Sequence, residues 1–275
     1  MDFKFNKMKK ILITGASEGI GLEIAGQFAQ AGNQVTLVSR NRDKLEKAIA
    51  RLTGSGHQYI LADLSKKEDA HLVADHIGQN HYDILVNNAG IGMYGRFEEM
   101  PLNEQISMVH LNIYSLTVLS HSYIKHARPG DSLVNIASTL GTTSFPGTAV
   151  YAATKAYVTN FSESLWWENK KRDIYVLGFC PGVTLTRFHN SAGGSSDKFP
   201  KFICQTPLAV AKEMIRALEK RKKPKTVSGT PNRLMLFFHR FLSRKMVVNM
   251  MGSFSPVGAA TGIIPQSKAN KESLA

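Results

Sequence analysis

Short runs of apolar residues alternate with longer amphipathic stretches along the first two thirds of the chain. Each run has the length of a β-strand and is bounded by polar residues or glycines, and the stretches between runs carry apolar residues at helical spacing. Between the first two runs these apolar positions are Leu22, Ile24, Ala25, Phe28 and Ala29. We expect strands at residues 10–14, 34–39, 57–61, 83–87, 131–137 and 174–179, and further helices at 42–52 and 66–78.

This alternation predicts an α/β fold: a doubly wound, Rossmann-like parallel sheet with right-handed crossovers and helices on both faces. Hydrophobic residues make up 43% of the 275 positions and charged residues 20%, which is typical of a globular chain. No stretch is apolar enough to predict a membrane-spanning helix. We expect one domain over residues 1–251, with a lid at 187–206 and a basic helical extension at 207–251, and a mobile tail at 252–275.

The charge is unevenly distributed. Lys and Arg total 34 and Asp and Glu total 21, a formal net charge of +13. Residues 1–200 hold 20 basic and 18 acidic side chains, whereas residues 201–275 hold 14 basic and 3 acidic ones. A nucleic-acid-binding protein would spread this charge over the fold or cluster it around a reading element. This chain instead has a nearly neutral body and a basic end, so we expect no nucleic-acid partner.

The two cysteines, Cys180 and Cys204, form neither a disulfide framework nor a pair of metal ligands. The basic N-terminus lacks an apolar stretch of signal-peptide length. The chain is therefore expected in a reducing, cytoplasmic compartment, with no metal site.

A glycine-rich turn follows the first expected strand and opens the first helix. Gly15 permits the tight turn, Gly19 lets the backbone approach a pyrophosphate closely, and Gly21 lets the helix pack on the strand. The helix N-terminus then offers free N–H groups to a phosphate. Because the turn lies in the first β-α-β unit, we expect a dinucleotide cofactor there. Its contacts are predicted at Gly15, Ser17, Glu18, Gly19, Ile20 and Gly21.

The end of the second expected strand indicates which cofactor is bound. An acidic residue there would accept a hydrogen bond from the ribose 2′-OH of NAD, but Arg40 and Arg42 follow Ser39 instead. Arginine pairs with a 2′-phosphate through charge-assisted hydrogen bonds. We therefore expect NADP(H) rather than NAD(H). The alternative is that both arginines are solvated loop charges.

A tyrosine and a lysine supply candidate acid–base chemistry. Tyr151 and Lys155 share a helix face at a spacing of four residues. A phenol of ordinary pKa, near 10, is a poor acid or base at neutral pH, and a neighbouring ammonium lowers that pKa. Such a pair occurs often by chance, but Ser138 ends a strand thirteen residues before Tyr151, and Asn112 lies in an expected helix upstream. The hydroxyl of Ser138 can bind the same substrate oxygen as Tyr151.

At these residues the sequence resembles the short-chain dehydrogenase/reductase family, in its compact single-domain branch. The resemblance covers roughly residues 10–190, with the landmarks in order. They are Thr14-Gly15-xxx-Gly19-x-Gly21, Asp63, Asn87-Asn88-Ala89-Gly90, Asn112, Ser138, Tyr151-xxx-Lys155 and Pro181-Gly182-xxx-Thr186. One departure is Thr184, which stands where the family often carries Ile or Val, with Val183 one place earlier.

The resemblance implies a role for each matching position. Tyr151 is the general acid/base, and Lys155 lowers its pKa and holds the nicotinamide ribose. Ser138 orients the substrate carbonyl, and Asn112 holds a water that links Lys155 to solvent. Asp63 contacts adenine, Thr186 contacts the carboxamide, and Arg40 selects NADP(H). The remaining cofactor contacts are expected at Leu64, Asn88, Ala89, Gly90, Pro181, Gly182, Val183 and Thr184.

These residues predict an NADP(H)-dependent oxidoreductase that interconverts a carbonyl and an alcohol. Aromatic and apolar residues near the tyrosine and in the expected lid predict an apolar substrate, although they can equally be ordinary core: Phe145, Met93, Tyr94, Phe188, Phe199, Phe202 and Ile203. Gly193-Gly194 is the expected hinge of the lid. Two alternatives are a catalytically silent NADP-binding regulator and an epimerase or dehydratase on the same fold. The presence of all four catalytic candidates argues against a silent regulator: Asn112, Ser138, Tyr151 and Lys155. The short segment after Pro181 argues against an epimerase or dehydratase.

The basic end is expected to be helical at 207–221, where Thr206-Pro207 opens the helix, and at 233–248. Arg233, Arg240 and Arg244 would then share one stripe of the second helix. This helix is interpreted as packing over the active site, as attaching peripherally to a membrane through its basic amphipathic face, or as a subunit interface. The family resemblance also implies a homodimer or homotetramer through the helices containing 101–126 and 151–170.

Overall fold

The computed structural model describes residues 7–188, 192 and 200–255. The core of this part is one sheet of seven parallel strands in the order β3-β2-β1-β4-β5-β6-β7. The strands are β1 (Lys10–Thr14), β2 (Gln34–Ser39), β3 (Gln58–Leu61), β4 (Ile84–Asn87), β5 (Ser132–Ile136), β6 (Tyr175–Cys180) and β7 (Lys225–Val227). The strand order reverses between β1 and β4, which places a crevice at the carboxyl ends of these two strands.

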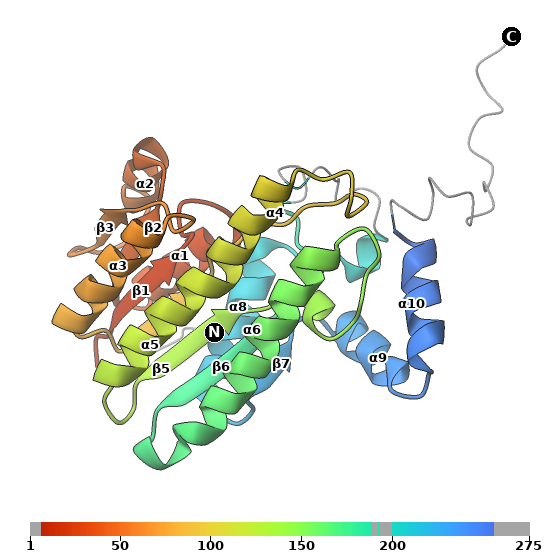
Figure 1. Ribbon diagram of the computed structural model, residues 1–275. Coiled ribbons are helices and arrows are strands. Elements are labelled where there is room, and N and C mark those ends of the chain that lie inside the picture. The colour runs from red at the N-terminus through yellow and green to blue at the C-terminus, as the bar shows by residue number, and fades with distance from the viewer. Residues whose placement is uncertain (1–6, 189–191, 193–199, 256–275) are drawn as a thin grey trace, which may run out of the picture.

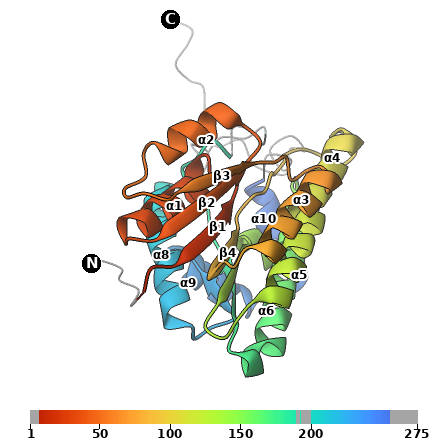
Figure 2. The same cartoon turned by 90° about the vertical axis from the view of Figure 1, so that its left-hand side faces the viewer.

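Helices cover both faces of the sheet, which Figure 2 shows nearly edge-on. One face carries α1 (Gly19–Gln30), α2 (Arg42–Ile49) and α8 (Pro207–Lys220), and the other carries α3 (Lys67–Gln79), α5 (Leu116–His126) and α6 (Ala149–Glu168). Before α5, α4 (Leu102–Val109) continues into a π-helical segment, η1 (His110–Ser115). The predicted doubly wound, Rossmann-like α/β class is confirmed.

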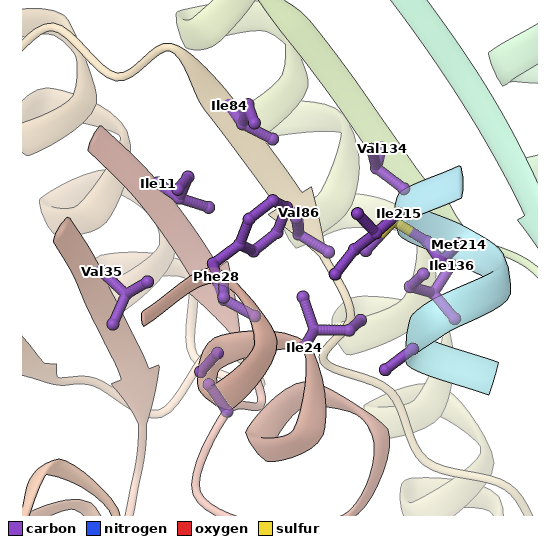
Figure 3. Packing of buried hydrophobic residues seen from close by; sticks show 14 of the residues in the cluster. Ile11, Ile24, Phe28, Val35, Ile84, Val86, Val134, Ile136, Met214 and Ile215 are labelled. Atoms are coloured by element: carbon purple, nitrogen blue, oxygen red, sulfur yellow. The ribbon is translucent and has the colours of Figure 1, made fainter. Parts of the chain in front are cut away.

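The alternation of side chains along each strand divides the core into two layers. On β1, Ile11 and Ile13 pack in the layer under α1 and α8, whereas Leu12 packs in the layer under α3 and α5. Figure 3 shows Phe28 and Ile24 of α1 beside Val86 of β4. Complete burial of one such side chain contributes about 1.5–3 kcal/mol. The apolar runs of the sequence therefore become strands that are covered on both sides.

The strand predictions are correct in position and differ at the ends. β1 and β2 have the predicted bounds, and the other four predicted strands shift by one residue at one or both ends. The helix predicted at 42–52 ends at Ile49. The sequence analysis missed β7, which pairs in parallel with β6. β7 has only three residues and follows a basic cluster, so it carries no strand-length apolar run.

The C-terminal extension differs from the prediction. The single helix expected at 233–248 is wrong: α9 (Thr230–His239) and α10 (Arg244–Ser253) are separate helices. Ser243 is extended, with ψ of 151°, and its Oγ accepts a hydrogen bond from Met246 N at 3.3 Å. This N-cap starts a new helix, so Arg233 and Arg244 do not share a helix. α8 begins as predicted, with Thr206 as N-cap and Pro207 in the first turn.

The predicted tail at 252–275 overlaps the end of α10, which extends to Ser253, and Ser255 is 2% exposed. The mobility of the tail stays a prediction. The rest of that segment, the predicted hinge Gly193-Gly194 and Phe199 lie outside the described residues. In the described ranges, no helix is both long and apolar enough to cross a bilayer.

Candidate active site

A cleft opens at the carboxyl ends of β1 and β4. Thr14 joins these strand ends: its Oγ1 accepts hydrogen bonds from Asn88 N and Ala89 N, both at 2.9 Å. Asn88 Nδ2 also donates to Thr14 O at 2.9 Å, so three hydrogen bonds join the end of β1 to the end of β4. The cleft has a volume of 1580 Å³. Pockets for drug-sized ligands have about 300–1,000 Å³, so this cleft has room for a dinucleotide together with a substrate.

The glycine turn at the base of the cleft requires its glycines. Gly15 has φ of +63°, and a Cβ on it would lie 2.8 Å from Ala89 Cα. A Cβ on Gly21 would lie 2.5 Å from Asn88 Nδ2, so Gly21 allows close packing and, unlike its neighbours, does not line the cleft. Gly19 has φ of +60°, and a Cβ on it would lie 3.5 Å from Thr186 Cγ2.

The start of α1 at this turn suits an anionic group. The N-cap residue Glu18 makes no capping side-chain hydrogen bond, and the first turn of α1 carries no acidic residue. Backbone N–H groups at an uncapped helix N-terminus, together with the helix dipole, favour a phosphate. The turn and the helix therefore fit the pyrophosphate of a dinucleotide.

The far end of the cleft is cationic. Arg40 lines it and is the more exposed partner of an ion pair with Asp63, at 4.0 Å between Nη1 and Oδ2. Arg42 points elsewhere: its Nη1 donates to Tyr59 OH at 3.2 Å and lies 3.9 Å from a Glu46 oxygen. Of the two candidate arginines, only Arg40 lies in the cleft.

Lys44 is a second cation at this end, which the sequence analysis missed. It lines the cleft, and its Nζ lies 2.9 Å from Glu18 Oε2. Asn41 caps α2 by accepting a hydrogen bond from Lys44 N at 2.9 Å. This N-cap pattern was visible in the sequence, and it would have placed Lys44 in the first turn of a helix that begins beside the adenosine end of the cleft.

The predicted cofactor residues therefore come together in one cleft, with Gly21 behind it. The lining includes Gly15, Ser17, Glu18, Gly19, Ile20, Arg40, Asp63, Leu64, Asn88, Ala89, Gly90, Tyr151, Lys155, Pro181, Gly182, Val183, Thr184 and Thr186.

The segment with the unusual Thr184 is held by Gln205. Gln205 N donates to Val183 O at 2.9 Å, and Leu185 N donates to Gln205 O at 2.9 Å. The side chain of Thr184 is buried, and its Oγ1 donates to Gly182 O at 3.1 Å. The segment with Thr184 therefore still lines the cleft, and the hydroxyl of Thr184 is satisfied by a hydrogen bond within the segment.

Three of the four predicted catalytic side chains surround one point in the cleft. Ser138 follows β5, and it shares a hydrogen bond with the hydroxyl of Tyr151 near the start of α6. Lys155 lies one turn further along α6, with Nζ 5.9 Å from the centroid of the Tyr151 ring. Lys155 Nζ donates to Ile136 O at 2.8 Å, which fixes its side chain. A carbonyl oxygen beside the Tyr151 hydroxyl would also be within reach of Ser138.

Burial changes the pKa of both ionisable groups. It raises the pKa of Tyr151 above its ordinary value, and the hydrogen bond from Ser138 only partly opposes this rise. Burial also lowers the pKa of Lys155 to about 8. The sequence analysis expected Lys155 to lower the pKa of Tyr151, and in this structure desolvation dominates instead. Tyr151 is therefore a neutral phenol at neutral pH, which is the proton-donating form.

Asn112 lies in the π-helical segment η1, behind the cleft lining. Its Oδ1 accepts from Ile91 N at 3.0 Å, and its Nδ2 donates to Ile91 O at 2.9 Å and to Thr154 Oγ1 at 3.1 Å. A π-helical turn often marks a functional site. A Cβ on Gly90 would lie 3.1 Å from Asn112 Oδ1 and 3.4 Å from Lys155 Nζ. The absence of this Cβ leaves a space that borders both polar groups.

The other end of the cleft is lined by apolar side chains. Of those predicted, Tyr94, Phe145, Phe188, Phe202 and Ile203 line it, and Met93 does not. The Phe188 ring packs on Tyr151, with ring centroids 5.6 Å apart. Packing of the C-terminal helical segment over the active site was one of the three interpretations of its sequence, but no lining residue was predicted there. The structure adds Pro231, Asn232, Met235, Met250, Met251 and Phe254 to the lining.

Comparison with known proteins identifies the family. The family model for short chain dehydrogenases matches residues 9–195. Together with the parallel sheet and the cleft, this match shows that the chain belongs to the short-chain dehydrogenase/reductase family.

The chain is similar to curated dehydrogenases and reductases. The 11-beta-hydroxysteroid dehydrogenase-like protein 3 of Arabidopsis thaliana is 34% identical over 187 residues, which are 65% of this chain and 60% of the relative. The 3-oxoacyl-(acyl-carrier-protein) reductase of Chlamydia pneumoniae is 34% identical over 186 residues, which are 65% of this chain and 74% of the relative. The chain thus spans less than two thirds of the length of the plant relative.

Solved structures agree with the fold. A short-chain dehydrogenase from Sphingobium yanoikuyae, in complex with NADPH, superposes with a TM-score of 0.76 at 26% identity, over 97% of this chain and 100% of the other. The 3-ketoacyl-(acyl-carrier-protein) reductase from Brucella melitensis, complexed with NADH, has a TM-score of 0.71 at 25% identity, over 81% of this chain and 96% of the other. Structural neighbours therefore include one complex with NADPH and one with NADH.

Proposed function

We propose that this protein is an NADP(H)-dependent oxidoreductase that interconverts a carbonyl and an alcohol on an apolar substrate. The observation that carries the proposal is the position of the Tyr151 hydroxyl. It hydrogen-bonds to Ser138 where the glycine-lined and cationic part of the cleft meets the aromatic part. A substrate carbonyl at this point would lie between a proton donor and the nicotinamide end of a bound cofactor.

The residues of the chain supply the acid–base half of the reaction. A reduced nicotinamide cofactor, when bound, supplies the hydride for the carbonyl carbon. The neutral hydroxyl of Tyr151 donates its proton to the carbonyl oxygen as negative charge develops there. Ser138 holds that oxygen by donating a second hydrogen bond. In the opposite direction, the phenolate accepts the proton of the alcohol.

Lys155 acts on the charge that Tyr151 acquires. With its pKa lowered to about 8 by burial, Lys155 is still mostly an ammonium at neutral pH. An ammonium near the Tyr151 ring stabilises the phenolate more than the phenol. The field of Lys155 thus assists the proton transfer while it occurs, although desolvation keeps the resting tyrosine neutral.

The proton that Tyr151 gives up must be replaced. The space above Gly90 borders both Asn112 Oδ1 and Lys155 Nζ, and a water there would accept from Lys155 and donate to Asn112. We propose this path as the route by which Lys155 exchanges protons with the surroundings.

The cofactor preference rests on cationic residues of this chain. The cleft carries Arg40 and Lys44 at its adenosine end, and two cations favour a 2′-phosphate over a free 2′-OH. The aromatic and methionine lining at the other end supports an apolar substrate.

The direct test is a screen for cofactor oxidation. Purified protein is mixed with NADPH, and in parallel with NADH, and with aliphatic ketones of graded chain length, steroid ketones and acyl-thioester ketones. We expect NADPH oxidation that is stoichiometric with ketone loss and faster for larger apolar ketones. Binding of NADPH without turnover of any carbonyl would overturn the proposal and favour a silent cofactor-binding protein.

A further inference from the structure

The outward face of α9 is apolar and exposed. Leu234, Phe237 and Phe238 lie at the i, i+3 and i+4 positions of one face of α9. Phe241 follows two residues after the helix ends and packs on Phe237, with ring centroids 5.4 Å apart. In chain order the four exposures are 53%, 51%, 61% and 74%. We call these four residues the α9 apolar face. In most helices of globular proteins such a face packs against the core. Here it is the opposite side of α9 that faces the protein, where Asn232 is buried.

Basic residues adjoin the α9 apolar face along the chain. Arg240 lies at the end of α9 and Arg244 and Lys245 lie at the start of α10, and all three are exposed. Residues 230–255 contain four basic side chains and no acidic one. The fourth, Arg233, is paired with Glu213 of α8 at 3.4 Å. Four large apolar side chains that are exposed together indicate an interaction site, and the basic residues that adjoin them in the chain favour an anionic partner.

The cleft opens next to this surface. Phe202 and Phe254 line the cleft and are 74% and 73% exposed. The short helix that holds Phe202, η5 (Lys201–Ile203), contacts α9. Met235, on α9 itself, also lines the cleft. Figure 1 shows α9 and α10 in blue at one end of the molecule. The mouth of the cleft and the α9 apolar face therefore belong to one surface.

We propose that the α9 apolar face docks on an anionic lipid surface, with its phenylalanines in the interface and the basic residues at the headgroups. This docking places the mouth of the cleft against the lipid, where an apolar substrate is concentrated. The part that concerns the substrate rests on the proposed function. Interfacial binding of this kind combines buried apolar area with attraction to anionic lipids.

A second copy of the chain fits this surface less well. A two-fold interface places the same patch on both subunits. It would bring Arg240, Arg244 and Lys245 of one copy close to the same residues of the other, with no acidic residue from the segment to offset them. Like charges that face each other across an interface oppose association. An anionic bilayer would attract these basic residues, so no such repulsion arises there.

The test is co-sedimentation of the full chain with vesicles, without substrate. Vesicles of phosphatidylcholine alone are compared with vesicles that also contain phosphatidylglycerol. We expect the wild type to bind the anionic vesicles, and Phe238→Ala/Phe241→Ala to lower the partition coefficient about tenfold or more, because two exposed aromatic rings no longer enter the interface. Arg240→Glu/Arg244→Glu should remove the preference for the anionic vesicles.

A matched pair of variants provides the control. Leu234→Ala, within the face, should weaken vesicle binding, whereas Leu72→Ala on α3 should not, although Leu72 is 54% exposed and Leu234 is 53% exposed. Oxidation of NADPH with a water-soluble ketone should be unchanged in all these variants. A failed ketone screen with intact vesicle binding would leave the docking surface standing without the proposed function.

Three results would overturn the proposal. The first is that the wild type binds neither kind of vesicle. The second is that Leu72→Ala and Leu234→Ala lower binding equally. The third is that sedimentation velocity shows a dimer that Phe238→Ala/Phe241→Ala dissociates, because the face would then be covered by a second copy.

Discussion

Two ionisable side chains on α6 have abnormal pKa values because each is buried. Tyr151 stays neutral above its ordinary pKa, and Lys155 loses its proton at a lower pH than a solvated lysine. Each shift disfavours the charged form of its group, so an empty cleft is an unfavourable place for both charges. The reaction requires the negative charge of the Tyr151 phenolate. We infer that this phenolate is stabilised once substrate and cofactor are bound in the cleft.

The buried lysine makes the stability of the protein depend on pH. Lys155 has a pKa of about 8 in the folded chain and 10.5 as an ordinary lysine. Between these values the unfolded chain binds more protons, so the folded state gains stability as pH rises and loses it as pH falls towards 8. In urea unfolding, the difference between wild type and Lys155→Met should shift in favour of the wild type, by up to about 3 kcal/mol between pH 7 and 10.5.

Lys155→Met also loses the hydrogen bond to Ile136 O, which lowers its free energy of unfolding by an amount that does not depend on pH. The test is therefore the slope, against pH, of the difference in free energy of unfolding between wild type and variant. A difference that does not vary with pH would contradict the abnormal pKa of Lys155.

Arg40 is the residue that should distinguish the two cofactors. Arg40→Ala should raise the KM for NADPH about tenfold, because it removes a charge-assisted contact with the 2′-phosphate, and should leave the KM for NADH nearly unchanged. Steady-state kinetics with both cofactors measure this. Arg42→Ala is the matched control, since Arg42 bonds to Tyr59 away from the cleft. Equal effects of Arg40→Ala on both cofactors would refute the assignment.

At the scale of elements, the site depends on how the short helix η2 (Thr139–Gly141) packs against α6. Ser138 is the N-cap of η2, and α6 carries Tyr151 and Lys155. A Cβ on Gly141 would lie 2.5 Å from both Lys155 O and Thr159 Oγ1. No side chain fits between these elements, so this glycine fixes the separation of Ser138 from Tyr151.

Gly141→Ala should therefore push the two elements apart. We expect a loss of about 1–3 kcal/mol in the free energy of unfolding, as for overpacked cores, together with a lower kcat. Gly26→Ala on α1 is the control, because no atom lies within 4 Å of its Cβ position. It should raise stability by about 0.5–1 kcal/mol, since alanine favours a helix. If both variants behave alike in urea unfolding, the packing argument fails.

Elements with strong local patterns could be predicted from the sequence. The bounds of β1 and β2 follow from apolar runs that end in a turn or a charged loop, and the N-terminus of α8 follows from Thr206-Pro207. The division of the last part into α9 and α10 depends on one N-cap, Ser243, inside a stretch that reads as helical throughout. β7 forms only because β6 is already there to pair with it.

The motif residues of the candidate site could be predicted from the sequence, whereas features that depend on tertiary packing could not. The glycine turn and the residues of the Tyr-xxx-Lys pattern lie where the motifs placed them. Tertiary packing decides which arginine faces the cleft and which side of α9 is exposed, and a single sequence does not show this. The pKa of Tyr151 also depends on burial, which no spacing reveals.

At the scale of the whole molecule, the charge is unevenly distributed over the fold. Residues 1–200 carry 20 basic and 18 acidic side chains and supply most of the cleft lining. Residues 201–275, which include α8 and β7 of the α/β body, carry 14 basic and 3 acidic side chains. Part of that excess adjoins the α9 apolar face along the chain. The whole molecule thus has a reaction cleft inside the sheet scaffold and an exposed, basic and apolar surface at its opening. Its oligomeric state stays a prediction.

The central claim is that Tyr151 transfers the proton to the substrate oxygen. Tyr151→Phe keeps the ring that packs on Phe188 and removes only the hydroxyl. The most direct measurement compares turnover of the best ketone from the screen with NADPH affinity, determined by fluorescence titration, in wild type and variant. We predict a fall in turnover of roughly a thousandfold, within the range of general acid–base catalysis, at nearly unchanged NADPH affinity. Turnover close to that of the wild type would contradict the account.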